Sequence, residues 1–183
     1  MNSFKFLQVA LFAFAATLTV LPTPPAGADE LPPLETVAYV DLSKYVGQWF
    51  EISSIPAFFS RGCVASTATY TALEDGNVGV VNECRKNSFD GEISRAEGVA
   101  TVEDKVTNAK LKVNFKWNPF SGTYWIIDLD PDYQWAVVGH PSRDYLWVLS
   151  RTAKMDAQLY QQILQRIEQK HYDVSKIQIT PQP

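Results

Sequence analysis

The chain has 183 residues, of which 46% are hydrophobic and 20% are charged, and its formal net charge at pH 7 is −4. This composition suits a single globular domain, and the negative charge excludes the basic face typical of nucleic-acid-binding proteins, so no nucleic-acid partner is expected. With only two His and two Cys, the chain cannot build a multi-ligand zinc site or an iron–sulfur cluster with the usual spacing, and we expect no metal and no cofactor.

Residues 1–28 have the pattern of a secretory signal peptide. Lys5 supplies the positive charge, residues 6–20 are almost wholly apolar, and prolines follow from position 22. The small-x-small sequence at 26–28 suits a signal peptidase. The apolar run is short for a membrane span and ends in prolines, so an uncleaved membrane anchor is the weaker alternative.

Removal of this segment leaves a protein that we expect to be soluble, exported, and either periplasmic or secreted. A lipid anchor needs a Cys directly after the apolar run, and none occurs before Cys63, which argues against a lipoprotein. Export also means an oxidising compartment, where Cys63 and Cys84 are expected to form a disulfide. Counting along the hairpin does not place these two Cys directly opposite each other, so the bond requires a bent strand or a mobile loop.

Residues 29–40 contain two prolines and are expected to form an extended lead-in to a domain that spans 41–183. Asp41 is a suitable N-cap, and it predicts one helical turn that reaches Tyr45. Eight β-rich segments separated by turn-forming residues come next. We expect strands at 48–55, 64–73, 78–86, 94–102, 110–117, 122–130, 133–139 and 145–151.

The segment 110–117 is the clearest of these strands. Its apolar side chains are Leu111, Val113, Phe115 and Trp117, and they alternate with Lys110, Lys112, Asn114 and Lys116. A period of two places the apolar set on one face of the strand and the polar set in water. This pattern is typical of a half-buried antiparallel strand.

A helical period replaces the strand period near the end of the chain. Asp156 is a good N-cap for 157–171, which has no Gly or Pro and carries Leu159, Ile163 and Ile167 at intervals of four. His171 stands where the helix is expected to end, because His tolerates the left-handed conformation better than most residues. A short strand at 175–180 is expected to follow.

These elements together predict an all-β fold. We expect an eight-stranded antiparallel up-and-down barrel, with one C-terminal helix packed on its outside and a short final strand.

Three segments resemble the signature motifs of the lipocalin family. Gly47 and Trp49 form its Gly-x-Trp motif at the start of the first strand. Asp132 and Tyr133 resemble the second motif, between the sixth and seventh strands, and Arg151 resembles the third, at the end of the eighth strand. Three motifs in order, each on its expected element, are far more specific than any one of them alone.

Within the family, the chain is most similar to the bacterial outer-membrane lipocalins (Blc type), with apolipoprotein D and plant lipocalins as relatives. The segments 118–124, 145–152 and 173–176 carry this closer similarity. Two features depart from the family pattern. Pro131 precedes the Asp-Tyr pair where Thr is usual, and the leader lacks the anchoring Cys of many bacterial members.

The resemblance implies that the motif residues form the closed floor of the barrel. Trp49 is expected to plug the floor, with the Arg151 guanidinium over its indole face. Gly47 allows a tight turn beside this plug. Asp132 and Tyr133 are expected to supply a cap and a ring for their turn.

A barrel of eight strands is either filled by side chains or holds one small ligand. Alternation from the motif residues predicts which side chains face inward, with Asp128 near the rim or floor. The expected ligand-binding residues are Glu51, Phe58, Phe59, Leu111, Val113, Phe115, Trp117, Tyr124, Ile126, Tyr145 and Trp147. Glu51 and Tyr124 are the candidates for a hydrogen bond to a head group.

This interior suits binding, storage or transport of a small hydrophobic ligand, such as a fatty acid, a lysophospholipid or a similar lipid, with a role in cell-envelope lipid maintenance. Phe58 and Phe59 lie on the loop after the first strand, and paired aromatics there favour a peripheral membrane contact.

Two other functions remain open. The first is a lipocalin-like enzyme acting on a lipid or pigment. The chain has no Gly-x-Ser-x-Gly elbow, and His140 and His171 are expected to be turn and cap residues, so we expect no enzyme. The second is a tetrapyrrole binder, for which Cys84 in its reduced form is the candidate ligand.

Overall fold

The computed structural model of this chain describes residues 31–116 and 121–183. Residues 31–183 form one compact unit. The predicted signal peptide, the first residues of the lead-in and Trp117 lie outside the described residues.

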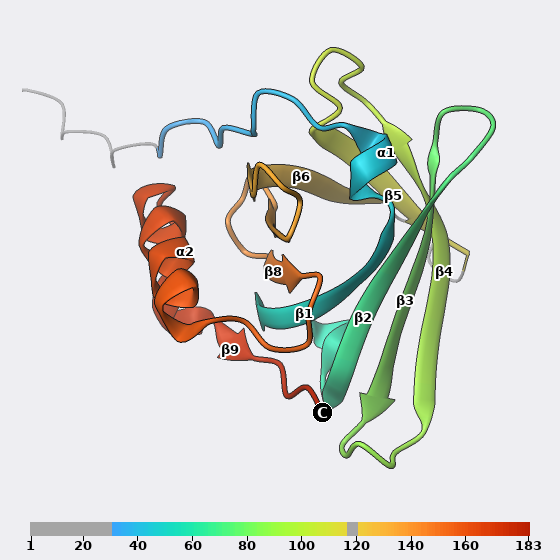
Figure 1. The fold of residues 1–183 in the computed structure, drawn as a ribbon, viewed down its shortest axis with the longest axis vertical. Coiled ribbons are helices and arrows are strands. Elements are labelled where there is room, and N and C mark those ends of the chain that lie inside the picture. The colour runs from blue at the N-terminus through green and yellow to red at the C-terminus, as the bar shows by residue number, and fades with distance from the viewer. Residues whose placement is uncertain (1–30, 117–120) are drawn as a thin grey trace, which may run out of the picture. The chain divides into compact units, whose positions relative to one another are not determined.

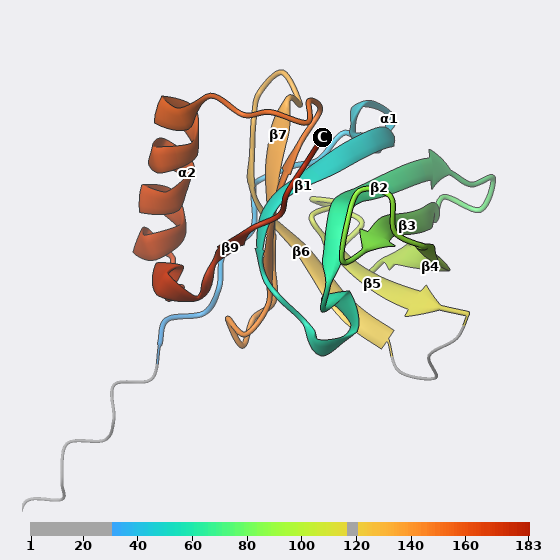
Figure 2. The same ribbon diagram turned by 90° about the horizontal axis from the view of Figure 1, so that it is seen from below.

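Eight strands form a closed antiparallel barrel, as predicted (Figures 1 and 2). Their bounds are β1 (Gly47–Ile55), β2 (Cys63–Ala72), β3 (Val78–Lys86), β4 (Ile93–Val102), β5 (Lys110–Phe115), β6 (Ser121–Leu129), β7 (Trp135–Gly139) and β8 (Leu146–Ser150). Each strand pairs with the next along the chain, and β1 pairs with both β8 and β2, which closes the barrel. Closure leaves these strands without the free edges that would otherwise invite pairing with another chain.

The strand boundaries differ from the prediction by one or two residues in most cases. The largest differences in the barrel are two residues, at the end of β5 and at the start of β7. The strand β7 begins at Trp135 because Tyr133 has a φ of +59° and belongs to the preceding turn. The predicted last strand is also shorter. A 3-10 turn over Val174–Lys176 occupies its start, and only β9 (Gln178–Ile179) pairs with β1.

The helix α2 (Ala157–Gln169) packs on the outside of the barrel, as predicted (Figure 2). Asp156 caps its N-terminus by accepting a hydrogen bond from the backbone N–H of Leu159 at 2.9 Å. Ile163 and Ile167 are completely or almost completely buried against the outer faces of β1, β6, β7 and β8. The helix ends two residues before its predicted end, and His171 has a φ of +64°, the left-handed conformation expected at that residue.

A bulge in β6 divides its side chains between the inside and outside of the barrel. The pairing with β7 shifts between Ile126 and Asp128. Before the shift the alternation is regular, with Ile126 packed inside the barrel and Ile127 in the cluster under α2. Asp128 also lies on the outside, where it pairs with the Arg166 guanidinium of α2 at 3.1 Å, so the inward face expected for it is wrong. A bulge adds one residue to a strand, and the alternation is lost at that point.

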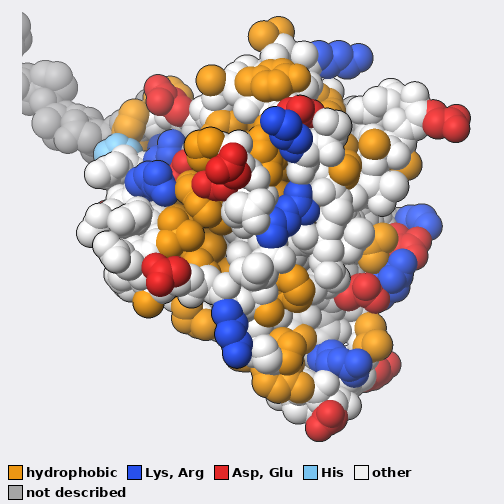
Figure 3. All heavy atoms as spheres, viewed as in Figure 1, with side chains coloured by type: hydrophobic (Ala, Val, Ile, Leu, Met, Phe, Trp, Pro, Cys, Tyr) orange, Lys and Arg blue, Asp and Glu red, His pale blue; other side chains and the backbone are white. Residues whose placement is uncertain are grey.

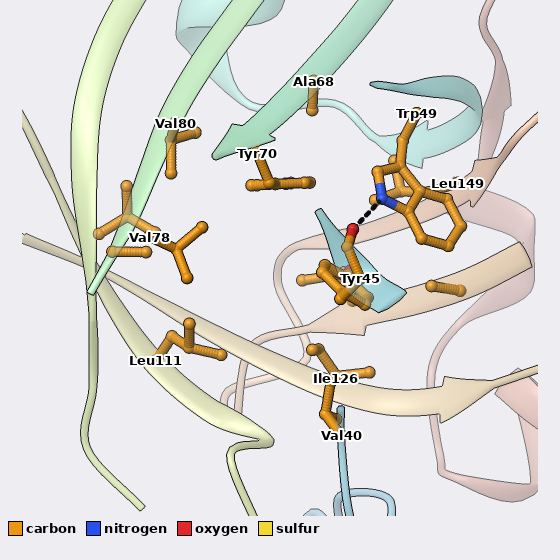
Figure 4. Close-up of a cluster of buried hydrophobic side chains, with 14 of the residues drawn as sticks. Val40, Tyr45, Trp49, Ala68, Tyr70, Val78, Val80, Leu111, Ile126 and Leu149 are labelled. Atoms are coloured by element: carbon orange, nitrogen blue, oxygen red, sulfur yellow. Dashed lines mark hydrogen bonds between the residues drawn. The ribbon is translucent and has the colours of Figure 1, made fainter. Parts of the chain in front are cut away.

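The lower half of the barrel is filled by side chains. Figure 4 shows this cluster, in which Trp49, Tyr45 and Ile126 meet aliphatic residues from the surrounding strands. The helical turn α1 (Leu42–Tyr45) closes this end, and Asp41 caps it by accepting a hydrogen bond from the N–H of Ser43 at 3.0 Å. The opposite end, between the loops that follow β1, β3 and β7, is the mouth.

The C-terminal tail completes the wall between β1 and β2. These strands pair directly only through residues 47–50 and 67–70. Toward the mouth, the tail fills the seam: Thr180 donates its N–H to Ile52, and Pro181 accepts from the N–H of Ala65. The Gln182 amide then donates to the backbone oxygens of Glu51 and Ser66, at 2.8 and 3.0 Å.

Charged side chains of both signs are interspersed with hydrophobic ones on the face seen in Figure 3. The ion pairs include Arg95 with Glu83 and Glu97, and Lys116 with Glu97. In the described part of the chain, no helix is long and apolar enough to cross a membrane.

Candidate functional site

A cavity of about 260 Å³ lies in the barrel between the filled lower half and the mouth. Its lining includes residues from seven of the strands and from the loop after β1. Six of the predicted ligand-binding residues line it: Glu51, Phe59, Val113, Phe115, Tyr124 and Trp147. The lining is mostly apolar, which suits a hydrophobic ligand.

Four of the other predicted ligand-binding residues do not line this cavity, and Trp117 lies outside the described residues. Leu111 and Ile126 lie deeper and border a separate void of about 10 Å³ in the filled half of the barrel. Phe58 is 69% exposed at the mouth and is not part of the cavity lining. Tyr145 lies at the rim, stacked on Trp147 with ring centroids 6.3 Å apart. The alternation of apolar and polar residues identified the inward faces of these strands. It did not show how far along the barrel axis the filled core extends before the cavity begins.

The sequence reasoning missed the wall formed by β2, β3 and β4. The cavity residues missed there include Ser66, Thr67, Ala68, Tyr70, Val80, Asn82, Ser94 and Ala96. Small and polar residues occupy both faces of these strands, so hydrophobicity gives little alternation. In β2 the pairing also shifts between Val64 and Thr67. Tyr70 was the one usable signal for this wall, because its large aromatic side chain lies two residues after Ala68 and therefore on the same face of β2.

Three tyrosine hydroxyls form a chain where the cavity meets the core. The Tyr124 hydroxyl lies 2.8 Å from the Tyr45 hydroxyl and 2.8 Å from the Tyr70 hydroxyl. Burial raises the pKa of all three phenols above the ordinary value, so they are neutral. All three tyrosines border the deeper void, and Tyr70 and Tyr124 also border the cavity.

Glu51 is the acidic side chain that β1 places inside the barrel. Its Oε1 accepts hydrogen bonds from the hydroxyls of Ser54 at 2.9 Å and Thr180 at 2.6 Å. Burial raises the pKa of the Glu51 carboxyl, and the two hydrogen bonds oppose that rise. Thr180 comes from the C-terminal tail, so the tail both completes the wall and holds this carboxyl.

The cavity has no positive counterpart to this carboxyl. Among the described residues that line it, none is Lys, Arg or His. Glu83 also borders the cavity, but its carboxylate pairs with Arg95 at 3.1 Å on the outer face of the barrel.

The floor motifs meet around Arg151. Its guanidinium carbon lies 3.7 Å from the centroid of the Trp49 ring, the contact that the resemblance implied. Trp49 is completely buried and donates its indole N–H to the Tyr45 carbonyl at 2.8 Å (Figure 4). Gly47 has a φ of +98°, and a Cβ there would lie 3.2 Å from Arg151 Nη1, so this position favours glycine.

The second motif departs from the expectation in one residue. The Tyr133 hydroxyl accepts a hydrogen bond from the N–H of Asp41 at 2.8 Å, which ties the turn to the start of α1. The expected capping role of Asp132 is wrong. Asp130 caps this turn instead, because its Oδ2 accepts from the N–H groups of Asp132 at 3.2 Å and Gln134 at 3.0 Å.

The predicted disulfide is present at the mouth. Cys63 and Cys84 are bonded, with Cα atoms 5.4 Å apart, and both residues border the cavity. The shift in β2 pairing provides the bent strand that the bond requires. Because Cys84 is bonded, it offers no free thiol to a tetrapyrrole.

His140 occupies a turn, as predicted. Its Nδ1 lies 2.7 Å from the Ser142 hydroxyl within the turn between β7 and β8. Neither His140 nor His171 borders the cavity. The histidines are therefore not placed to act on a molecule inside the barrel.

Comparisons with known proteins agree with this geometry. A family model described as a lipocalin-like domain matches residues 40–182. Temperature-induced lipocalin-1 of Arabidopsis thaliana is 43% identical over 157 residues, covering 81% of this chain and 83% of the relative. The outer membrane lipoprotein Blc of Escherichia coli K12 is 36% identical over 183 residues, covering 100% of this chain and 99% of that protein.

A solved structure has the same fold. Insecticyanin from the tobacco hornworm Manduca sexta superposes with a TM-score of 0.67 at 19% identity, covering 84% of this chain and 87% of that one. At this identity the likeness concerns the fold alone.

Proposed function

This chain belongs to the lipocalin family, and from that premise we propose that it binds, stores or transports a small hydrophobic ligand in its barrel cavity. The observation that carries the proposal is the mostly apolar cavity of about 260 Å³ beneath the mouth. Burial of apolar surface contributes about 0.8 kcal/mol per methylene, so a lipid chain binds such a cavity without extensive head-group contacts.

The ligand class that fits best is a single-chain lipid, such as a fatty acid or a lysophospholipid. Phe115 and Trp147 supply large apolar contacts from opposite sides of the barrel, and Phe59 covers the mouth. Glu51 and Tyr124 add polar groups to this otherwise apolar lining. A role in cell-envelope lipid maintenance follows from this ligand class and from the relative named as an outer membrane lipoprotein.

The disulfide supports export, because such bonds persist in oxidising compartments. We accordingly propose that residues 1–28 act as a signal peptide and that the domain works in the periplasm or outside the cell.

A membrane contact through the mouth is part of the same proposal. Phe58 and Phe59 are 69% and 49% exposed, and their rings meet edge to face at 5.4 Å. Phe59 also borders the cavity, so insertion of this pair into a lipid surface places the cavity entrance beside the acyl chains.

Ligand binding is tested by filling the cavity from one wall. Ala96 on β4 borders the cavity, and Ala96→Trp is expected to abolish quenching of tryptophan fluorescence by added single-chain lipid. Val99 lies on the same strand but is 38% exposed on the outside, so Val99→Trp is the matched control and should bind like the parent protein. Equal binding by both variants would place the ligand outside the cavity.

Native mass spectrometry of gently purified protein identifies any lipid that co-purifies. The proposal predicts a bound single-chain lipid in the parent protein and in Val99→Trp, and none in Ala96→Trp. A parent protein that neither retains nor binds any lipid would refute ligand binding.

A further inference from the structure

One oxygen of the buried Glu51 carboxyl remains available to a ligand. Both protein hydrogen bonds to this carboxyl, from Ser54 and Thr180, go to Oε1. No hydrogen bond from the described residues reaches Oε2, although the side chain borders the cavity. A carboxyl oxygen that faces the cavity without a protein partner favours a donor group of a bound molecule.

The tyrosine chain leaves one proton unused. Three hydroxyls carry three O–H donors, but the chain from Tyr45 through Tyr124 to Tyr70 contains only two hydrogen bonds. One donor therefore remains whichever way the chain is oriented. In two of the three orientations the remaining donor is on Tyr70 or Tyr124, both of which border the cavity.

The groups around Glu51 offer no positive charge. The neighbouring β2 presents Tyr70, β8 presents Leu149, and the C-terminal tail presents Thr180. Tyr70 is the titratable one of these three, and the Glu51 carboxylate contributes, after burial, to the raised pKa of Tyr70. An ionised carboxylate from a ligand would therefore meet a like charge in a poorly hydrated site and no cation.

A hydroxyl group satisfies both features, since it donates one hydrogen bond and accepts others. We propose that Glu51, Tyr70 and Tyr124 form a polar subsite that takes an uncharged hydroxyl group of the ligand, and that Glu51 selects against an ionised carboxylate at the inner end of the cavity. The ligand class is then a long-chain lipid with a neutral glycerol or alcohol end, such as a monoacylglycerol. This inference rests on the proposed lipid binding and names which lipids the cavity prefers.

The test compares two probes with the same acyl chain, palmitate and 1-monopalmitoylglycerol, below their aggregation concentrations at pH 8. The parent protein is expected to bind the monoacylglycerol about tenfold or more tightly than palmitate, because the like charges repel. Glu51→Gln should strengthen palmitate binding by about tenfold and weaken monoacylglycerol binding a few-fold, because a neutral amide oxygen accepts a weaker hydrogen bond from the ligand hydroxyl. Glu97→Gln makes the same charge change on the outside of the barrel and should leave both affinities unaltered.

Calorimetry of the parent protein provides a second measurement that needs no variant. Titrations at pH 8 in buffers of different ionisation enthalpy count the protons taken up on binding. Binding of palmitate is expected to be accompanied by uptake of a proton, because either the palmitate carboxylate or Glu51 must be neutralised. Binding of the monoacylglycerol should be accompanied by no proton uptake.

Equal affinity for the two probes, with no change in their ratio in Glu51→Gln, would overturn the subsite while leaving lipid binding intact. Palmitate binding without proton uptake would do the same. Failure of both probes to bind the parent protein would instead refute the proposed function.

Discussion

The Arg151 guanidinium covers the Trp49 indole at 3.7 Å and at the same time binds the backbone of two other floor segments. It donates to the carbonyls of Lys44 at 2.7 Å, Val46 at 3.0 Å and Gln48 at 3.0 Å. A further hydrogen bond, at 3.2 Å, goes to the carbonyl of Tyr133 in the turn before β7. One side chain at the end of β8 thus fastens the end of α1, the start of β1 and this turn, which closes the barrel floor.

Replacement of Arg151 should therefore destabilise the whole barrel. Arg151→Met keeps much of the aliphatic length but loses the carbonyl hydrogen bonds and the contact with the indole. We expect a loss of about 2–4 kcal/mol in the free energy of unfolding, because several backbone carbonyls lose a charged donor. Urea denaturation followed by circular dichroism measures this. Unchanged stability would show that water replaces the guanidinium without cost.

Removal of the buried indole should affect stability more than ligand binding. Trp49→Ala leaves a large hole in the filled half of the barrel, and we expect a loss of about 3–5 kcal/mol with a lower melting temperature. The cavity walls lie above this plug, so the folded fraction should still bind lipid. Binding lost at an unchanged melting temperature would assign Trp49 to the binding site instead of the floor.

The disulfide should stabilise the mouth end of the barrel. It closes a segment with a sequence separation of 21, for which the chain-entropy estimate is about 3 kcal/mol. The variant carrying both Cys63→Ser and Cys84→Ser is expected to lose about that amount in urea denaturation. Reduction of the parent protein with dithiothreitol should produce the same change, and an unaffected denaturation midpoint in both experiments would contradict it.

The buried Glu51 carboxyl should make stability fall as pH rises. Burial raises its pKa in the folded protein, so between the ordinary carboxyl pKa and that raised value the folded state binds more protons than the unfolded state. The resulting penalty is complete above the folded pKa and vanishes below the unfolded one. Glu51→Gln does not titrate, and its stability relative to the parent should increase from pH 4 to pH 8.

Glu97→Gln provides a control in which the effect of the substitution on folding stability should depend on pH in the opposite direction. Hydrogen bonds and ion pairs with Lys116 and Arg95 lower the pKa of Glu97, so its contribution is present above the unfolded pKa and is lost as pH falls. This variant should be slightly less stable than the parent at pH 8, and the difference should be small because the pairs are exposed. Parallel profiles of stability against pH for Glu51→Gln and the parent would show that burial does not raise the pKa of the Glu51 carboxyl.

Elements whose pattern is local could be predicted from the sequence. The alternation of Leu111, Val113 and Phe115 with polar residues identified β5, and the interval of four between Leu159, Ile163 and Ile167 identified α2. These periods repeat the geometry of the strand and the helix themselves, so they need no knowledge of the rest of the chain. The three floor motifs were identified by their resemblance to the lipocalin signature, and the resemblance also implied that they meet at the floor.

The binding site depended on contacts between distant parts of the chain. Thr180 holds the Glu51 carboxyl across 129 positions, and Tyr70 meets Tyr124 across 54. Alternation alone could not show that Ile126 lies in the filled core while Tyr124, two residues earlier, borders the cavity. The sequence by itself determined the strands, the helix and the floor, because their signals are short-range periods and motifs. Only the tertiary structure decided where the core ends and which polar groups face the ligand, because both depend on how side chains from opposite walls fill the barrel.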